Sequence, residues 1–301
     1  MLGQSNLKHL KKTHMIDPNF SESQLQTAAN LAYANEIRKK TGGIPFPFVP
    51  SLPAEFMLGW DTAFDLDWLR HRLSGPFALH HKGCNFFLQY KLSSLVDRSS
   101  SPKEWGIWGK PYFRFQIPHR KKIGKRYHND FHQWDRLKEI AKAGVPTFYA
   151  TNTMLEENDL KSLFENGTLL SRVALLDIAP IKRKHVRASF AEPFSNFSLH
   201  SIPEETRLLS FAEALSGFEG ISSHSYDQGI EQLITIAENL TKNDSSDSEA
   251  LSIREQISQF QQLFTTYIGR REGLPQVKRA MLESFFARRF GLVVSWHPVI
   301  S

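Results

Sequence analysis

The sequence has a single cysteine, Cys84, among its 301 residues. An intrachain disulfide and a cysteine-rich zinc module are therefore excluded. No apolar run approaches the ~20 residues of a transmembrane helix. Residues 1–14 are basic and polar, without the apolar core of a secretory signal. Neither GxGxxG nor GxxxxGK[ST] occurs, so no motif favours a nucleotide-binding fold. We expect a cytoplasmic protein that does not interact with a membrane.

The sequence contains many aromatic residues and a local excess of positive charge. The 23 Phe and 6 Trp predict a globular core. The net charge is +6, but residues 103–142 alone hold eleven Lys or Arg against four acids, a local balance of +7. A second basic cluster spans residues 182–187. Such patches bind polyanions by neutralising phosphates, although many basic loops are simply solvated. The expected nucleic-acid contacts are Arg120, Lys121, Lys122, Lys125 and Arg126.

The order of the expected elements favours an α/β fold with a mixed central sheet flanked by helices. We expect helices at 21–40 and 129–143, and strands or extended segments at 55–66, 85–92, 111–117, 145–151 and 169–178. The C-terminal region is expected to be largely helical, with helices at 210–215, 228–240, 251–267 and 276–289 and a final strand at 292–296. The predicted division is a core at 21–180 and a helical region at 205–301. If the final strand returns to the sheet, both parts form one domain.

The strand at 85–92 has two different faces. Phe86, Leu88, Tyr90 and Leu92 form an apolar face that we expect to be buried, whereas Gln89 and Lys91 lie on the other face. Glu55 and Asp61 are six residues apart, so they would share a face of an unbroken strand. Two carboxylates, an amide oxygen and an ammonium group together would suit a hard divalent cation and a phosphate.

Gly59-Trp60-Asp61 and Gln89-Tyr90-Lys91, with Gln89 standing 28 residues after Asp61, resemble the PD-(D/E)XK nuclease superfamily. The form resembled has glutamine in place of the final acid, as in type IV restriction endonucleases. The resemblance covers residues 21–178 and implies a restriction-endonuclease-like core. It implies that Asp61 and Gln89 bind Mg²⁺ or Mn²⁺, that the backbone carbonyl of Tyr90 is a further ligand, and that Lys91 serves the nucleophile.

Three further residues are candidates for the same site. The superfamily often takes an acid from the helix before the first strand, where the candidate is Glu36, but Glu55 is preferred because it is nearer the strand. His132 and Gln133 stand at the start of the helix at 129–143, where a solvated helix start is the simpler interpretation of His132.

Together these residues predict a metal-dependent nuclease that hydrolyses phosphodiester bonds, with DNA favoured over RNA. A role in anti-phage or mobile-element defence follows by analogy with the superfamily. The alternative is a catalytically inactive module on the same fold that binds nucleic acid or protein. The sequence leaves the oligomeric state open.

Overall fold

The computed structural model describes residues 15–41, 46–48, 63–65, 82–98, 102–117, 121–123, 126–128, 133–200, 203–221, 223–242, 255, 258 and 274–298. The strands are β1 (Met15–Ile16), β2 (Phe46–Phe48), β3 (Ala63–Asp65), β4 (Gly83–Lys91), β5 (Ser94–Val96), β6 (Tyr112–Gln116), β7 (Lys121–Ile123), β8 (Arg126–His128), β9 (Thr147–Asn152), β10 (Val173–Asp177), β11 (Arg187–Phe190), β12 (Asn196–His200), β13 (Glu204–Ser210) and β14 (Val293–Pro298). The α-helices are α1 (Glu22–Thr41), α4 (Pro102–Trp108), α5 (Gln133–Lys142), α6 (Glu157–Glu165), α7 (Phe211–Gly217), α8 (Tyr226–Lys242) and α10 (Leu274–Phe290), with 3₁₀ turns η2 (Leu169–Ser171) and η3 (Phe218–Gly220).

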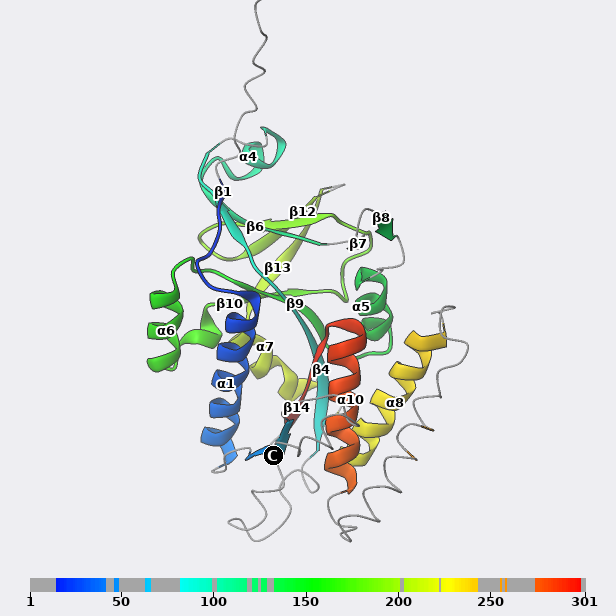
Figure 1. Cartoon of the computed structure of the whole chain (residues 1–301). Helices are drawn as coiled ribbons and strands as arrows, with labels where there is room; N and C mark the ends of the chain where they lie inside the picture. The colour runs from blue at the N-terminus through cyan, green and yellow to red at the C-terminus, as the bar shows by residue number, and fades with distance from the viewer. Residues whose placement is uncertain are drawn as a thin grey trace, which may run out of the picture.

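The centre of the fold is a ten-stranded mixed sheet in the order β1-β5-β6-β11-β12-β13-β10-β9-β4-β14 (Figure 1). β4 and β9 are parallel neighbours, and the chain between them includes α5. The other neighbouring pairs in this sheet are antiparallel. β2–β3 and β7–β8 form two small sheets that are not hydrogen-bonded to the large one. The α/β fold with a mixed sheet flanked by helices is therefore confirmed.

Helices cover both faces of the sheet around β4. Residues of α1, α6 and α7 pack in one apolar cluster with Phe86, Leu88 and Tyr90, each of which is 1% exposed. Residues of α5, α8 and α10 pack in a second cluster with Phe87 on the opposite face. The predicted burial is confirmed for Phe86, Leu88 and Tyr90, whereas Leu92 lies just after the strand and is only partly buried. The face that carries Gln89 is buried too. The Gln89 face is buried because α8 and α10, which come from the distant C-terminal region, pack against it.

The predicted start of the first helix is also observed. The Ser21 Oγ accepts a hydrogen bond of 3.1 Å from the Gln24 backbone N–H, and the Gln24 side chain accepts one of 2.8 Å from the Ser21 N–H. This reciprocal capping satisfies two N–H groups that the first turn leaves free. Leu25 and Ala29 then point into the core, as the apolar spacing predicts. Among the described helices, none is both long and apolar enough to cross a membrane.

The C-terminal region contributes strands as well as helices to this architecture. β13 pairs with β10 and β12, and β14 pairs antiparallel with β4 over six residues. The expected helices at 228–240 and 276–289 and the final strand at 292–296 correspond to α8, α10 and β14. Because β14 closes on β4, the region expected as a helical tail shares the sheet of the core.

Two glycines allow this close packing around Trp296 of β14. A Cβ added to Gly229 of α8 would lie 2.3 Å from the Trp296 ring, and one added to Gly83 of β4 would lie 2.5 Å from the His297 carbonyl oxygen. Real side chains do not tolerate such distances. The absence of a Cβ at these two positions therefore lets α8, β4 and β14 meet.

Some expectations were incomplete. The strand expected at 169–178 is divided into η2 and β10, and the strands β11 and β12 and the helices α4 and α6 were not predicted. The helix expected at 129–143 is described from residue 133. Most of the expected strand at 55–66 and of the expected helix at 251–267 lies outside the described residues.

Candidate functional site

The predicted site is only partly within the structure. Glu55, Asp61, Arg120, Lys125 and His132 lie outside the described residues. Lys121 is in β7 with Lys122, Arg126 is in β8, and Gln133 is the first residue of α5. Gln89, Tyr90, Lys91 and Glu36 are described with their side chains. Of the predicted site, the structure therefore describes the residues of β4, which are Gln89, Tyr90 and Lys91.

Gln89 lies on the face of β4 that α8 and α10 cover, and it is 5% exposed. Its Nε2 donates a weak hydrogen bond of 3.5 Å to the backbone carbonyl of Tyr90, and its Oε1 has no hydrogen-bond partner in the described part of the chain. The loop after α10 closes over this amide, since a Cβ on Gly291 would lie 3.8 Å from Oε1. A buried oxygen without a partner costs roughly 1–3 kcal/mol, so this atom favours a ligand or a water.

A second polar atom of this kind stands on the neighbouring strand. Tyr149 of β9 is the register partner of Gln89 and is fully buried. Its hydroxyl oxygen, like the Gln89 oxygen, lacks a hydrogen-bond partner among the residues that the structure describes. Burial raises the pKa of the Tyr149 hydroxyl well above its ordinary value, so this group stays protonated and able to donate. Adjacent strands β4 and β9 thus each carry one buried oxygen without a hydrogen-bond partner among the described residues.

Lys91 ends β4 beside the first turn of α1. Its Nζ lies 4.0 Å from a carboxylate oxygen of Glu22, and the lysine side chain is 16% exposed against 45% for the glutamate. Burial lowers the pKa of Lys91, and the charge of Glu22 acts in the opposite direction. Burial likewise raises the pKa of Glu22, while Lys91 lowers it. Each charge therefore helps to keep the other ionised.

The sequence interpretation offered Glu36 as the candidate acid from this helix, second to Glu55, and did not name Glu22. Glu36 pairs instead with Lys39, three residues further on, at 2.6 Å. Glu36 is fourteen residues after Glu22 in the helix, which places it roughly 21 Å further along the axis at 1.5 Å per residue. Glu36 is therefore not brought to Lys91. No local pattern in the sequence marks Glu22, because its contact with Lys91 depends on how α1 packs on the sheet.

The ends of the two parallel strands are bonded to each other. The hydroxyls of Ser93 and Thr151 share a hydrogen bond of 2.6 Å. The Asn152 side chain accepts from the Ser93 N–H at 2.7 Å and donates to the Ser93 carbonyl at 3.0 Å. All three side chains are buried. This network fixes the backbone directly after Lys91 and thus holds the lysine at the carboxyl edge of β4 and β9.

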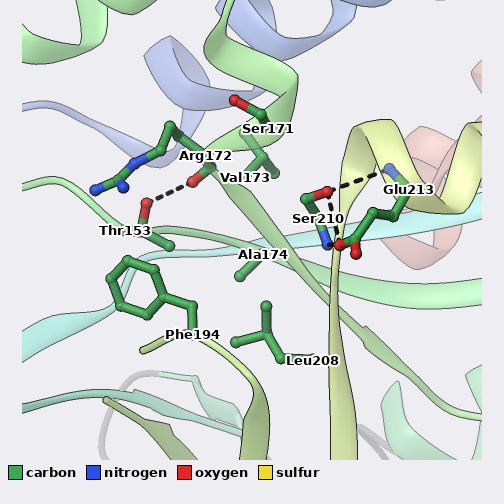
Figure 2. A pocket seen from close by; sticks show the side chains of 9 residues that line it. All are labelled: Thr153, Ser171, Arg172, Val173, Ala174, Phe194, Leu208, Ser210 and Glu213. Carbon is green, nitrogen blue, oxygen red and sulfur yellow. Dashed lines mark hydrogen bonds between the residues drawn. The ribbon is translucent and has the colours of Figure 1, made fainter. Parts of the chain in front are cut away.

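A pocket of about 150 Å³ opens further along the same edge, at the ends of β10 and β13 (Figure 2). The guanidinium carbon of Arg172 lies 5.3 Å from the centre of the Phe194 ring, which forms one wall. On the opposite side, Glu213 accepts hydrogen bonds from the Ser210 backbone and hydroxyl. The Thr153 hydroxyl donates to the Arg172 carbonyl. The Thr153, Ser210 and Glu213 side chains are thus engaged in hydrogen bonds within the pocket wall.

A charged cluster attaches α4 to the sheet. Glu104 is 2% exposed, and its carboxylate lies 3.1 Å from Arg114 of β6 and 2.7 Å from Arg187 of β11. It also accepts a hydrogen bond from the Tyr112 hydroxyl. Burial acts to raise the pKa of Glu104, but the hydrogen bond from Arg114 and the nearby positive charges hold that pKa below its ordinary value. The cluster is therefore an ionised buried network.

The same cluster contains a serine and a histidine in contact. The Ser189 Oγ lies 2.6 Å from the His200 Nε2, and the Trp108 indole donates to Ser189 at 2.8 Å. Burial lowers the pKa of His200, which favours its neutral form. This pair resembles the activated serine of a hydrolase, but Ser189 is fully buried and Trp108 covers it. Without access for a substrate, the pair has a structural role.

No grouping of three or more His, Cys, Asp or Glu suited to a metal occurs in the described part of the chain. The predicted carboxylate ligands, Glu55 and Asp61, are outside that part. Comparisons with protein-family models, with curated proteins and with solved structures found no match for this chain.

Proposed function

We propose that this chain is a metal-dependent nuclease that hydrolyses phosphodiester bonds, with DNA favoured over RNA. One observation carries the proposal. Gln89 and Lys91 stand on β4, and the chain passes through α5 to the parallel strand β9. This is the helix-and-strand order that the superfamily resemblance implies after a Gln-x-Lys strand. The basic residues at 120–126 lie within the same connection.

The side chain of Gln89 fits a hard cation. Its amide oxygen is buried and lacks a hydrogen-bond partner within the described residues, and Mg²⁺ prefers oxygen ligands. In this proposal Asp61 and Glu55 supply the carboxylates, with the Tyr90 carbonyl as a further ligand. The bound ion would neutralise the scissile phosphate and lower the pKa of a water molecule.

Lys91 has a separate role in the proposal. Its ammonium orients the attacking water and stabilises the negative charge that develops on the phosphate oxygens. Burial lowers the pKa of Lys91, so a nearby anion favours its charged ammonium form. Glu22, at 4.0 Å, is that anion in the structure. Glu22 is thus a positioning residue for Lys91.

The direct test is incubation of the purified chain with plasmid, linear duplex and single-stranded DNA and with RNA. Each substrate is tested with Mg²⁺, with Mn²⁺ and with EDTA. The proposal expects cleavage of DNA with either metal and none with EDTA. Cleavage that persists in EDTA, or no cleavage of any substrate with either metal, contradicts it.

A binding module without catalysis is the second candidate, and the burial of Gln89 favours it. The amide is 5% exposed beneath Gly291, and a neutral glutamine binds a metal less strongly than a carboxylate. The same assay separates the two functions, because a binding module retains DNA in a gel shift while cutting none of the substrates. The role in defence rests on the superfamily resemblance alone.

A further inference from the structure

One face of the large sheet is polar where β6, β11 and β12 run side by side. Register partners of antiparallel strands share a face, so the pairs Arg187–His200, Ser189–Ser198 and Ser189–Arg114 put their side chains together. The opposite face of the same strands lies in the apolar core, with Phe115, Ala188, Phe190, Phe197 and Leu199. An antiparallel sheet of this kind commonly leaves its polar face to water.

This polar face is instead covered by α4. Ser189 is fully buried, and Ser198, Arg114 and His200 are 2%, 8% and 9% exposed. The Trp108 indole of α4 donates a hydrogen bond of 2.8 Å to Ser189. The sheet therefore holds a group of polar side chains beneath a helix of seven residues.

The attachment of α4 combines two aromatic side chains with one carboxylate. Trp105 and Trp108 pack on a small apolar cluster that is separate from the two large ones. Figure 1 shows α4 at the top of the view, beyond β6 and away from the other labelled helices. Glu104 supplies the ionic contacts of α4 to Arg114 and Arg187. The docking of this helix thus depends strongly on the Glu104 carboxylate.

That carboxylate does not satisfy both arginines. The Arg114 guanidinium and the Tyr112 hydroxyl both donate to the Glu104 Oε2, each at 3.1 Å. The Glu104 Oε1 lies 2.7 Å from the Arg187 Nη2, but it has no hydrogen-bond partner among the described residues. The buried Arg187 Nε has none there either. A buried donor without an acceptor is unfavourable, so the second guanidinium is poorly served.

The network also joins more positive than negative charge. Glu104 brings one negative charge against the guanidiniums of Arg114 and Arg187. Burial lowers the pKa of His200, which favours its neutral form. Glu205 of β13 stands opposite Ser198 but is exposed. Surplus positive charge beside an unfilled donor favours an anion with more charge and more oxygens than a carboxylate.

We propose that this polar face is a binding site for a phosphate dianion, which Arg114, Arg187 and the Tyr112 hydroxyl hold in place of the Glu104 carboxylate when α4 moves away. Phosphate oxygens accept from both guanidiniums, and the second negative charge balances the second arginine. Glu104 is then an internal anion that closes the empty site. Inorganic phosphate and a phosphate monoester share this chemistry. The site is independent of the proposed nuclease function, because it uses no residue of β4.

The first test uses Glu104→Ala, which removes the internal anion and keeps both arginines. Melting temperatures are measured with phosphate, acetate or chloride at equal ionic strength, above the second phosphate pKa of about 6. Glu205→Ala is the control, because it removes an exposed acid beside the same face. The double variant Glu104→Ala with Arg187→Gln removes a donor of the site.

We expect phosphate to raise the melting temperature of Glu104→Ala by about 5 °C, and that of the double variant by much less. Phosphate should act at a concentration at least ~10-fold lower than acetate, which has one charge and two oxygens. Phenyl phosphate distinguishes the two sources. Stabilisation by it as well identifies a monoester as a ligand, and stabilisation by inorganic phosphate alone identifies the free ion. Equal stabilisation by acetate, or equal phosphate effects in Glu104→Ala and Glu205→Ala, overturns the proposal.

The second test uses the parent chain and does not depend on the folding of a variant. Hydrogen–deuterium exchange of residues 104–109 is followed through a phosphate titration, with α6 as the internal reference. If phosphate replaces Glu104, the amides of α4 should exchange several-fold faster while those of α6 are unchanged. Unchanged exchange in α4 throughout the titration overturns the proposal and identifies Glu104 as a permanent part of a structural network.

Discussion

The ammonium of Lys91, at the end of β4, lies 4.0 Å from the carboxylate of Glu22, in the first turn of α1. The two residues come from distant parts of the sequence and are joined only because α1 packs on the sheet. Lys91 is the more buried member, so it depends more on its partner than Glu22 does. Because the two residues differ in burial, substitutions of Lys91 and of Glu22 should have different effects.

Lys91→Ala is expected to lower the DNA cleavage rate by about 10²–10³-fold, because the charge that meets the developing negative charge is removed. DNA binding and folding should be nearly intact. An ion pair with one exposed member contributes about 0–1 kcal/mol, so the melting temperature should change by less than about 4 °C. Lys82→Ala is the control, because Lys82 is exposed directly before the same strand.

Steady-state cleavage kinetics and thermal melts check this prediction together. A Lys91→Ala protein that cuts at the parental rate, in a preparation free of contaminating nuclease, removes this residue from catalysis. A large loss of stability with unchanged cleavage indicates a purely structural lysine.

Glu22→Gln should move the alkaline limb of the pH–rate profile to lower pH. Burial lowers the pKa of Lys91, and the charge of Glu22 raises it. Without that charge the pKa falls further, and an activity that needs the ammonium is lost at a lower pH. Glu36→Gln on the same helix is the control, because Glu36 pairs with Lys39. Identical profiles for the two variants would show that Glu22 does not act on Lys91.

Glu104→Gln should destabilise the protein by about 3 kcal/mol, since it leaves the buried Arg114 without its counter-charge. The melting temperature should fall by roughly 6–12 °C. Because the pKa of Glu104 is lowered in the fold, its contribution is present above the ordinary value of 4.5 and is lost as the pH falls through the folded value. The variant should therefore lose less stability on acidification than the parent.

Differential scanning calorimetry between pH 7 and pH 3 measures both effects. Glu165→Gln is the control, because Glu165 is 61% exposed and lies 3.8 Å from Lys161. Equal melting temperatures for the Glu104 and Glu165 variants at pH 7 are incompatible with a stabilising buried network.

Gly229→Ala should destabilise the protein by about 1–3 kcal/mol, because the new Cβ would lie 2.3 Å from the Trp296 ring and would separate α8 from β14. Gly217→Ala is the matched control at the end of α7. A Cβ there would meet nothing within 4 Å, and the helical position favours alanine. Chemical denaturation compares the two, and a Gly229→Ala protein as stable as the Gly217→Ala protein contradicts the close packing described here.

Local patterns in the sequence were sufficient for several elements. The alternation at 85–92 predicted β4, and the apolar spacing at 21–40 with Ser21 before it predicted α1. The order of strand, helix and strand through 145–151 was sufficient for the α/β class. These features depend on side-chain periods and on capping groups, which act within one element and are therefore readable from neighbouring residues.

Only the tertiary structure decided what meets these elements. The Gln89 face of β4 is covered because α8 and α10, from the far end of the chain, pack where the sequence indicated a polar face, and β14 pairs along the edge of β4. Glu22 rather than Glu36 reaches Lys91, because the direction of α1 against the sheet chooses which end of the helix meets the strand end. The network of Glu104, Arg114 and Arg187 joins α4, β6 and β11, which have no shared period. Contacts between distant segments depend on packing, and no local pattern records them.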